Sequence, residues 1–289
     1  NVDCLDWFDG RCDGCGAVLA YFKFRYGAAM MVFVWMFVFV LAAVLGSFAN
    51  VLVYRLPLMV MREEVGDERM LMFNLACPAS HCPACENPLR WWHNIPLVSF
   101  MVLHGRCGFC GVSIPQRYFL IELGSVLIGL YCYGQFGWSI HALMWFVFLY
   151  LLWVMSWIDV AHFLLPDALT LLLLWLGLLW KAAAMPEQLV DAIFGAALGY
   201  VLLRVVYEVH HYFTGRQGMG MGDMKLMAAI GAWLGLLQVP NVLLVSCVGA
   251  LLYAAYARLR FRTVVIPFGP FLAFGAVVVL CASRYFNLG

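Results

Sequence analysis

The composition of this chain excludes a soluble globular domain. Of its 289 residues, 65% are hydrophobic and only 11% are charged, and the mean hydropathy is +0.90, whereas a soluble domain carries about 25% charged residues. We therefore expect an all-α polytopic protein with about eight transmembrane helices and the lipid bilayer as a partner. The net charge of +1 gives no indication of nucleic-acid binding.

The first segment, residues 1–26, is expected to be an extracytoplasmic leader, and its four aspartates make it too polar for a cleavable signal peptide. Its three cysteines, an odd number to which we assign no pairing, are Cys4, Cys12 and Cys15. Residues 27–56 are predicted to form the first transmembrane helix, because a span needs about 20 residues. The small residues of Gly46-Ser-Phe-Ala-Asn50 would allow a close approach of helices there.

A polar loop, residues 57–116, is predicted to be a cytoplasmic zinc-binding domain. Two Cys-x-x-Cys pairs separated by 21 residues supply Cys82, Cys85, Cys107 and Cys110. Four thiolates at this spacing are typical of a tetrahedral structural zinc site. Two disulfides are the alternative, which a reducing compartment disfavours. A loop of about sixty residues has too small a core to hold itself together without such a site, and Cys77 and His81 are nearby alternative ligands.

The remainder, residues 117–289, is predicted to be a seven-helix membrane domain. Its polar breaks place the spans near 118–136, 139–158, 168–185, 189–212, 224–237, 240–257 and 264–283. Lysine and arginine are enriched in cytoplasmic loops. With eight spans, the positive residues opposite the zinc-binding loop are Arg11, Lys23, Arg25, Lys181 and Arg284, which leaves 12 of the 17 on the side of that loop. We expect that side to be cytoplasmic and both termini to lie outside.

Two carboxylates stand out in the membrane domain. Asp159 ends the third span in Trp157-Ile-Asp, and Asp223 precedes the sixth in the glycine-rich stretch 218–225. The topology puts both at the cytoplasmic boundary, where an ionisable group is costly and by default functional. Two carboxylates that share one proton are the machinery of aspartic proteases. A serine or cysteine nucleophile would need a histidine base, and no histidine of the later spans lies beside an obvious nucleophile.

Each carboxylate has a structural alternative. Asp223 could be the N-cap of its helix, and Asp167, after Leu-Pro, could be the N-cap of the fourth span. Asp159 lies at a helix C-terminus, where the dipole disfavours an anion. We therefore favour Asp159 as the partner of Asp223, with Asp167 and Lys225 in supporting roles. Farther along, Glu122 is expected to pair locally with Arg117.

The glycines before Asp223, at positions 218, 220 and 222, permit backbone angles closed to other residues and a close approach of an extended substrate chain. Gly220 and Gly222 are therefore expected to support the site. A proton-coupled transporter is an alternative that also uses paired carboxylates. It would require an inverted repeat and carboxylates at the membrane midplane, and we find no convincing repeat.

Several motifs together resemble those of the bacterial type IV prepilin peptidases, which are intramembrane aspartic proteases of the GxGD type. They are Gly46-Ser-Phe-Ala-Asn-Val, Tyr54-Arg-Leu-Pro57, the two Cys-x-x-Cys pairs, Asn94-Ile-Pro96, Arg117-Tyr118 with Glu122, Ile158-Asp159, Leu165-Pro-Asp167 and Gly220-Met-Gly-Asp223-Met-Lys225. The similarity runs from about residue 27 to near the C-terminus.

The resemblance implies an inner-membrane aspartic endopeptidase that removes the leader of type IV prepilins or of type II secretion pseudopilins. It implies cleavage after a glycine at the cytoplasmic membrane boundary, with Asp159 and Asp223 as the catalytic pair and the four cysteines as zinc ligands. It also implies methylation of the new N-terminus with S-adenosylmethionine. No glycine-rich nucleotide motif identifies where the methyl donor would bind.

Overall fold

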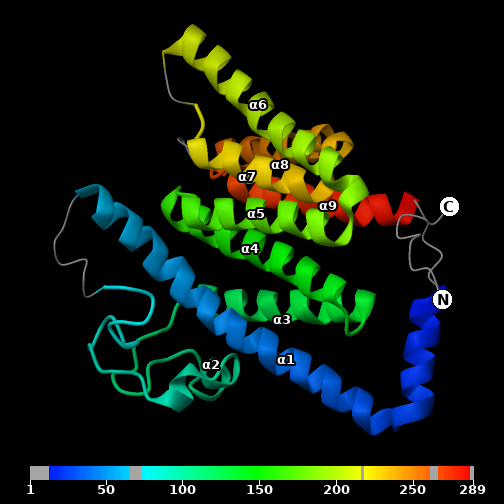
Figure 1. Ribbon diagram of the computed structural model, residues 1–289. Coiled ribbons are helices and arrows are strands. Elements are labelled where there is room, and N and C mark those ends of the chain that lie inside the picture. The colour runs from blue at the N-terminus through cyan, green and yellow to red at the C-terminus, as the bar shows by residue number, and fades with distance from the viewer. Residues whose placement is uncertain (1–12, 66–72, 216–217, 261–265, 287–289) are drawn as a thin grey trace. The chain divides into compact units, whose positions relative to one another are not determined.

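The structure is a computed structural model that describes residues 13–65, 73–215, 218–260 and 266–286 (Figure 1). Within these ranges the secondary structure is helical, apart from two isolated β-bridges, which confirms the all-α prediction. Cys4 and Cys12 lie outside the described residues. The chain divides into an N-terminal unit, Asp13–Val154, and a C-terminal unit that contains Met155 and the residues after it.

Six of the described helices are long and apolar enough to cross a membrane. They are α1 (Asp13–Val65), α3 (Gln116–Phe136), α4 (Ile140–His162), α5 (Asp167–Ala184), α6 (Leu189–Thr214) and α8 (Val239–Arg260). Two further helices occupy the other predicted spans, α7 (Met221–Leu234) and α9 (Gly269–Phe286). Every predicted span therefore coincides with a helix, and the chain is a multi-pass membrane protein.

In the N-terminal unit, α1 and α3 pack closely because small residues line their contact. A Cβ added at Gly46 would lie 2.9 Å from the Glu122 Cα atom, and one added at Gly129 would lie 2.7 Å from the Ala42 Cβ atom. The close approach predicted at Gly46 is confirmed. α1 also bends at Gly27, whose φ of 70° favours glycine over a residue with a side chain.

The loop between α1 and α3 folds back onto these two helices. It carries the short helix α2 (Val98–Val102) and a 3-10 turn, η2 (Trp91–Asn94). Leu97 is buried in one apolar cluster with Ala42, Ala43 and Val126 of the spans. The loop is therefore anchored to the apolar parts of α1 and α3.

Arg55 of α1 holds the beginning of that loop. The side chain is only 7% exposed and donates hydrogen bonds to the carbonyl oxygens of Asn74, Leu75 and Pro78, at 2.9, 3.3 and 2.6 Å. A buried guanidinium needs such partners because desolvation of an unpaired charge is costly.

In the C-terminal unit, α7 is the central helix, and it packs against α5, α6, α8 and α9 (Figure 1). It has no exposed face along most of its length, since every residue from Leu226 to Trp233 is buried. Glycines let α6 approach it to backbone contact: a Cβ added at Gly195 would lie 2.5 Å from the Gly231 carbonyl oxygen. The Trp233 indole N–H donates to the Leu173 carbonyl oxygen of α5 at 2.9 Å.

Candidate active site

Asp159 lies in the last turn of α4 and is 5% exposed. Its Oδ2 accepts a hydrogen bond of 2.8 Å from the backbone N–H of Gly269, the first residue of α9. The first N–H groups of a helix have no partner within it and carry a partial positive charge. The start of α9 thus offsets the unfavourable position of Asp159 at the end of α4.

Gly269 is required at that position by its lack of a side chain. A Cβ there would lie 2.8 Å from Asp159 Oδ2, too close for the hydrogen bond to persist without movement. The sequence reasoning missed this residue. The only signal for it was Phe268-Gly-Pro270, since a proline just inside a helix start follows a common pattern.

Asp223 is the third residue of α7 and is 7% exposed. The N-cap of α7 is Gly220, without a side-chain cap bond, so the alternative of Asp223 as an N-cap is wrong. The helix places the carboxyl group inside the unit. There the negative charge of Asp159 acts on it.

The two carboxylates thus come from different helices and interact electrostatically in a buried position. The Gly269 N–H joins the start of α9 to the end of α4, and α7 packs against α9. Two like charges at close range in a low-dielectric setting are costly, and such a pair holds one proton between its members. The arrangement can therefore provide a general base and a general acid side by side.

Asp167 and Lys225 form an ion pair beside this site. The Lys225 Nζ atom lies 2.6 Å from both carboxylate oxygens of Asp167, and the two side chains are 30% and 59% exposed. The N-cap of α5 is Pro166, so the N-cap interpretation of Asp167 is wrong. The pair instead joins the first turn of α5 to the first turn of α7.

The glycines before Asp223 differ from the expectation of special backbone angles. Gly218, Gly220 and Gly222 are absent from the positive-φ residues of the described chain. A Cβ at Gly222 would lie 2.7 Å from Leu165 Cβ, and one at Gly218 would lie 2.7 Å from the His210 ring. These two glycines let the protein pack against itself. Only Gly220 is open, with its nearest neighbour 3.7 Å away.

The four loop cysteines come together in the N-terminal unit. The Sγ atoms of Cys82, Cys85, Cys107 and Cys110 all lie within 4.8 Å of one another, and Cys82 Sγ is 3.9 Å from Cys110 Sγ. Tetrahedral zinc with four sulfur ligands at about 2.3 Å separates them by about 3.8 Å. The donor set and its spacing therefore fit a metal ion. All four are free thiols, so the disulfide alternative is not what the structure adopts.

Backbone N–H groups in the two turns favour thiolates. The N–H of Asn87 lowers the pKa of the Cys85 thiol, and those of Cys110 and Phe109 lower the pKa of Cys107 to about 7. The Val112 N–H favours the Cys110 thiolate too, yet desolvation and hydrogen bonds to the other three thiols raise its pKa to about 11. Four thiolates repel one another at this distance. They are stable together only when a bound cation balances their charge, as in a metal site.

Glu122 of α3 makes a connection that the sequence reasoning assigned differently. Its carboxylate accepts hydrogen bonds from the Leu97 backbone N–H at 2.8 Å and from the Asn50 side-chain amide at 3.2 Å. The described chain contains no ion pair between Glu122 and Arg117; the Arg117 guanidinium lies over the Tyr118 ring instead. The predicted pairing is therefore wrong.

Two known protein families match this chain. The Bacterial Peptidase A24 N-terminal domain matches residues 40–136, and the Type IV leader peptidase family matches residues 146–255. The chain belongs to the type IV leader peptidase family. The four cysteines lie in the first matched region and both buried aspartates in the second.

Relatives in this family are similar over most of their length. A prepilin leader peptidase/N-methyltransferase of Stutzerimonas stutzeri is 42% identical over 254 residues, 83% of this chain and 88% of the relative. Proteins of the same name from Pseudomonas aeruginosa and Burkholderia pseudomallei are 42% and 41% identical, over 83% and 87% of this chain and 87% and 86% of theirs. No solved structure matches the chain significantly.

Proposed function

We propose that this protein is an inner-membrane aspartic endopeptidase that removes the leader peptide of type IV prepilins or type II secretion pseudopilins, with Asp159 and Asp223 as its catalytic pair. The observation that carries the proposal is a pair of buried carboxylates on separate helices whose charges interact. The family membership and the relatives' names support the substrate class and the reaction.

The reaction follows the chemistry of a carboxylate pair that holds one proton. The ionised member removes a proton from a water molecule as its oxygen attacks the scissile carbonyl carbon. The protonated member donates its proton to the carbonyl oxygen, which gives a tetrahedral diol. Collapse of the diol breaks the C–N bond as a proton passes to the departing nitrogen. The products are the leader with a new carboxyl group and the mature chain with a new amine.

The position of the pair supports a peptidase over the transporter alternative. Asp159 lies in the last turn of α4 and Asp223 in the first turn of α7, both at helix ends rather than midway along a span. The excess of lysine and arginine on that side of the predicted topology favours the cytoplasmic face. Gly220, the open glycine of the turn, leaves room for a substrate backbone beside Asp223.

The relatives' names also support methylation of the new N-terminus, and we include this activity in the proposal, with S-adenosylmethionine as the donor. Zinc is the metal we propose for the four cysteines. Bound there, it would hold the two Cys-x-x-Cys turns together, which is a structural role.

Cleavage of a purified prepilin by the protein in detergent or nanodiscs tests the proposal. Asp159→Asn and Asp223→Asn are expected to lower the rate by at least about a thousandfold, with unchanged helical content and thermal transition. The matched control is Glu187→Gln, which changes an exposed acid in the turn just before α6. This variant should cleave normally. Cleavage at more than a tenth of the normal rate by either Asn variant would remove that residue from the pair.

A further inference from the structure

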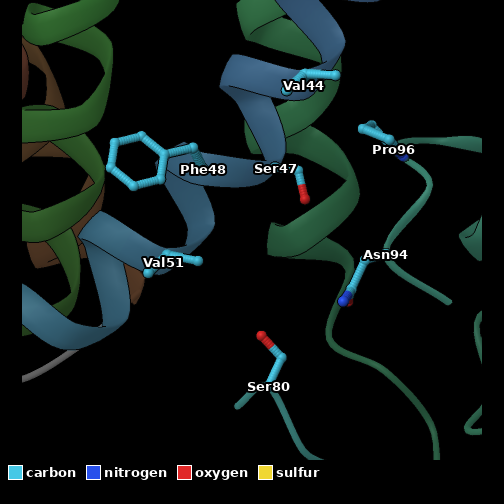
Figure 2. Close-up of a pocket in the computed structure, with 7 residues that line it drawn as sticks. All are labelled: Val44, Ser47, Phe48, Val51, Ser80, Asn94 and Pro96. Carbon is cyan, nitrogen blue, oxygen red and sulfur yellow. The ribbon is translucent and has the colours of Figure 1, made fainter. Parts of the chain in front are cut away.

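A pocket in the N-terminal unit is not accounted for by the aspartate pair or the cysteines. It has a volume of about 240 Å³ and lies between α1 and the loop before α3 (Figure 2). Ser47 contributes one wall from α1, while Ser80 and Asn94 contribute the other from the loop. The apolar lining comes from Val44, Val51 and Pro96, among others.

Three uncommitted polar side chains converge on this space. Figure 2 shows the Ser47 and Ser80 hydroxyls and the Asn94 carboxamide around it, from two separate parts of the chain. In the part of the chain that the structure describes, none of these three side chains makes a hydrogen bond. Asn94 is exposed and the two serines are half-buried, so all three side chains are accessible to a ligand.

The pocket lies beside apolar parts of the spans. Leu97, next to the lining residue Pro96, hydrogen-bonds Glu122, which is six residues into α3 and so about 9 Å along that helix at 1.5 Å per residue. On α1, the lining residues Val44 and Phe48 are 54% and 43% exposed within the apolar span. The pocket therefore borders exposed apolar residues of the α1 span, near one end of the α3 span.

The lining chemistry discriminates among ligands. Among the described residues, none of those that line the pocket is charged. S-adenosylmethionine carries a sulfonium, an ammonium and a carboxylate, and the volume is below the roughly 300–1,000 Å³ of pockets that enclose drug-sized ligands. The pocket therefore does not fit the methyl donor. A lipid acyl chain would leave all three polar groups unpaired.

An extended peptide fits these features. Its N–H and C=O groups need both donors and acceptors, and serine hydroxyls and an asparagine amide offer both. Its uncharged side chains match the apolar walls. We propose that this pocket binds an uncharged, extended segment of the prepilin chain, through Ser47, Ser80 and Asn94. The inference rests on the proposed substrate class and adds a recognition site on the N-terminal unit.

Photo-crosslinking tests the proposal without requiring cleavage. A photoreactive phenylalanine analogue replaces Phe48 in the Asp223→Asn protein, in nanodiscs, with full-length prepilin added. The matched control is the same substitution at Leu127, a 57% exposed residue of α3 that does not line the pocket. A crosslink to prepilin from position 48 but not from 127 is expected. Equal yields at both positions, or none at 48, would overturn the proposal.

Kinetics and methyl-donor binding provide a second test in the active protein. Removal of two hydrogen-bonding groups in the Ser47→Ala/Asn94→Leu double variant is expected to raise KM for prepilin about tenfold or more, with kcat within about twofold. Ser113→Ala, an exposed serine outside the pocket, should leave both unchanged. An unaltered KM contradicts the proposal.

Calorimetric titration of the same variants with S-adenosylmethionine completes the test. Equal affinity in the normal and double-variant proteins is expected; lost affinity with an unaltered KM would assign the pocket to the methyl donor instead. The crosslink does not depend on which residues catalyse cleavage. If the Asn variants of the aspartate pair remained active, the proposed catalytic pair would fail while the crosslink result still stood.

Discussion

The two units of the chain differ in what surrounds their buried charged side chains. In the N-terminal unit, buried Arg55 bonds three carbonyl oxygens and thereby holds the loop. In the C-terminal unit, buried Lys181 has the Gln188 amide oxygen at 2.6 Å, but no described cation pairs with Asp159 or Asp223. Those two acids are both buried, and the charge of Asp159 acts on Asp223. The comparison teaches that the buried cations are matched by oxygen acceptors that hold structure together, whereas the buried aspartates are two like charges, of which Asp159 accepts a hydrogen bond from the Gly269 N–H.

Both units bring helices close through glycines, at Gly46 in the first and at Gly195 in the second, and the first unit also carries a polar loop. The N-terminal unit joins a polar loop to its helices through side-chain hydrogen bonds, as Glu122 does with Leu97. The C-terminal unit brings helices to backbone contact through glycines, as at Gly195 and Gly231. Changes in polar residues should therefore weaken the first unit. In the second unit, added side-chain volume between helices should lower stability, and replacement of the aspartates should lower activity.

Loss of a cysteine should have the largest effect on structure. Cys107→Ser removes one of four thiolate ligands, and structural zinc sites supply much of the folding free energy of small domains. We expect metal content to fall from about one per chain to near zero and the loop to become rapidly cleaved by added protease. Cys247→Ser, an exposed cysteine outside the cluster, is the control. Full metal retention in Cys107→Ser would contradict the site.

Added volume between α6 and α7 should come next. A side chain at Gly195 meets the Gly231 carbonyl oxygen of the neighbouring backbone, which cannot move as a flexible side chain can. Gly195→Leu is expected to lower the free energy of unfolding by about 3 kcal/mol or more, measured by denaturation in mixed detergent. In Gly134→Ala the added Cβ has its nearest neighbour at an ordinary 3.4 Å, so this control should change stability little.

Much of the architecture was predictable because it depends on local composition. Apolar runs interrupted by polar residues gave the position of each span, and the Cys-x-x-Cys spacing predicted a cluster that the structure brings together. Both depend on residues near one another in sequence or on a ligand set with a known spacing. The choice of Asp159 over Asp167 as the partner of Asp223 used helix-end electrostatics and stays a prediction, which the electrostatic influence of Asp159 on Asp223 supports.

What escaped prediction depends on packing between distant segments. The Gly269 N–H reaches Asp159 across 110 positions, and no local pattern identifies that partner. The N-cap interpretations of Asp167 and Asp223 failed because capping depends on where the helix begins, to the residue. The glycines before Asp223 also illustrate the limit: what two of them meet, Leu165 and a histidine ring, belongs to other segments.

A smaller effect is expected from Glu122, whose charge strengthens its hydrogen bond to the Leu97 N–H. Glu122→Gln keeps a neutral acceptor in the same place but loses the charge-assisted part, so stability should fall by about 1 kcal/mol. Glu122→Ala removes both bonds and should cost about twice as much. Glu208→Gln, which alters an exposed pair with Arg204, should stay within about 0.5 kcal/mol. Equal stability of all three variants would mean that Glu122 does not hold the loop.

The smallest effect is expected from loss of the Asp167–Lys225 ion pair. Variants of this pair also distinguish between two roles for Lys225. If the lysine only joins α7 to α5, Lys225→Met loses a partly exposed ion pair of about 0–1 kcal/mol, and prepilin cleavage should fall less than about fivefold. Asp167→Asn should reproduce that loss, and the charge-reversed Asp167→Lys/Lys225→Asp double variant should recover part of it. If the lysine instead stabilised the Asp223 charge directly, Lys225→Met would approach the inactivity of the Asn variants while Asp167→Asn would not. The 2.6 Å distances to both oxygens of Asp167 favour the first outcome, because an ammonium held in that position has its charge already matched.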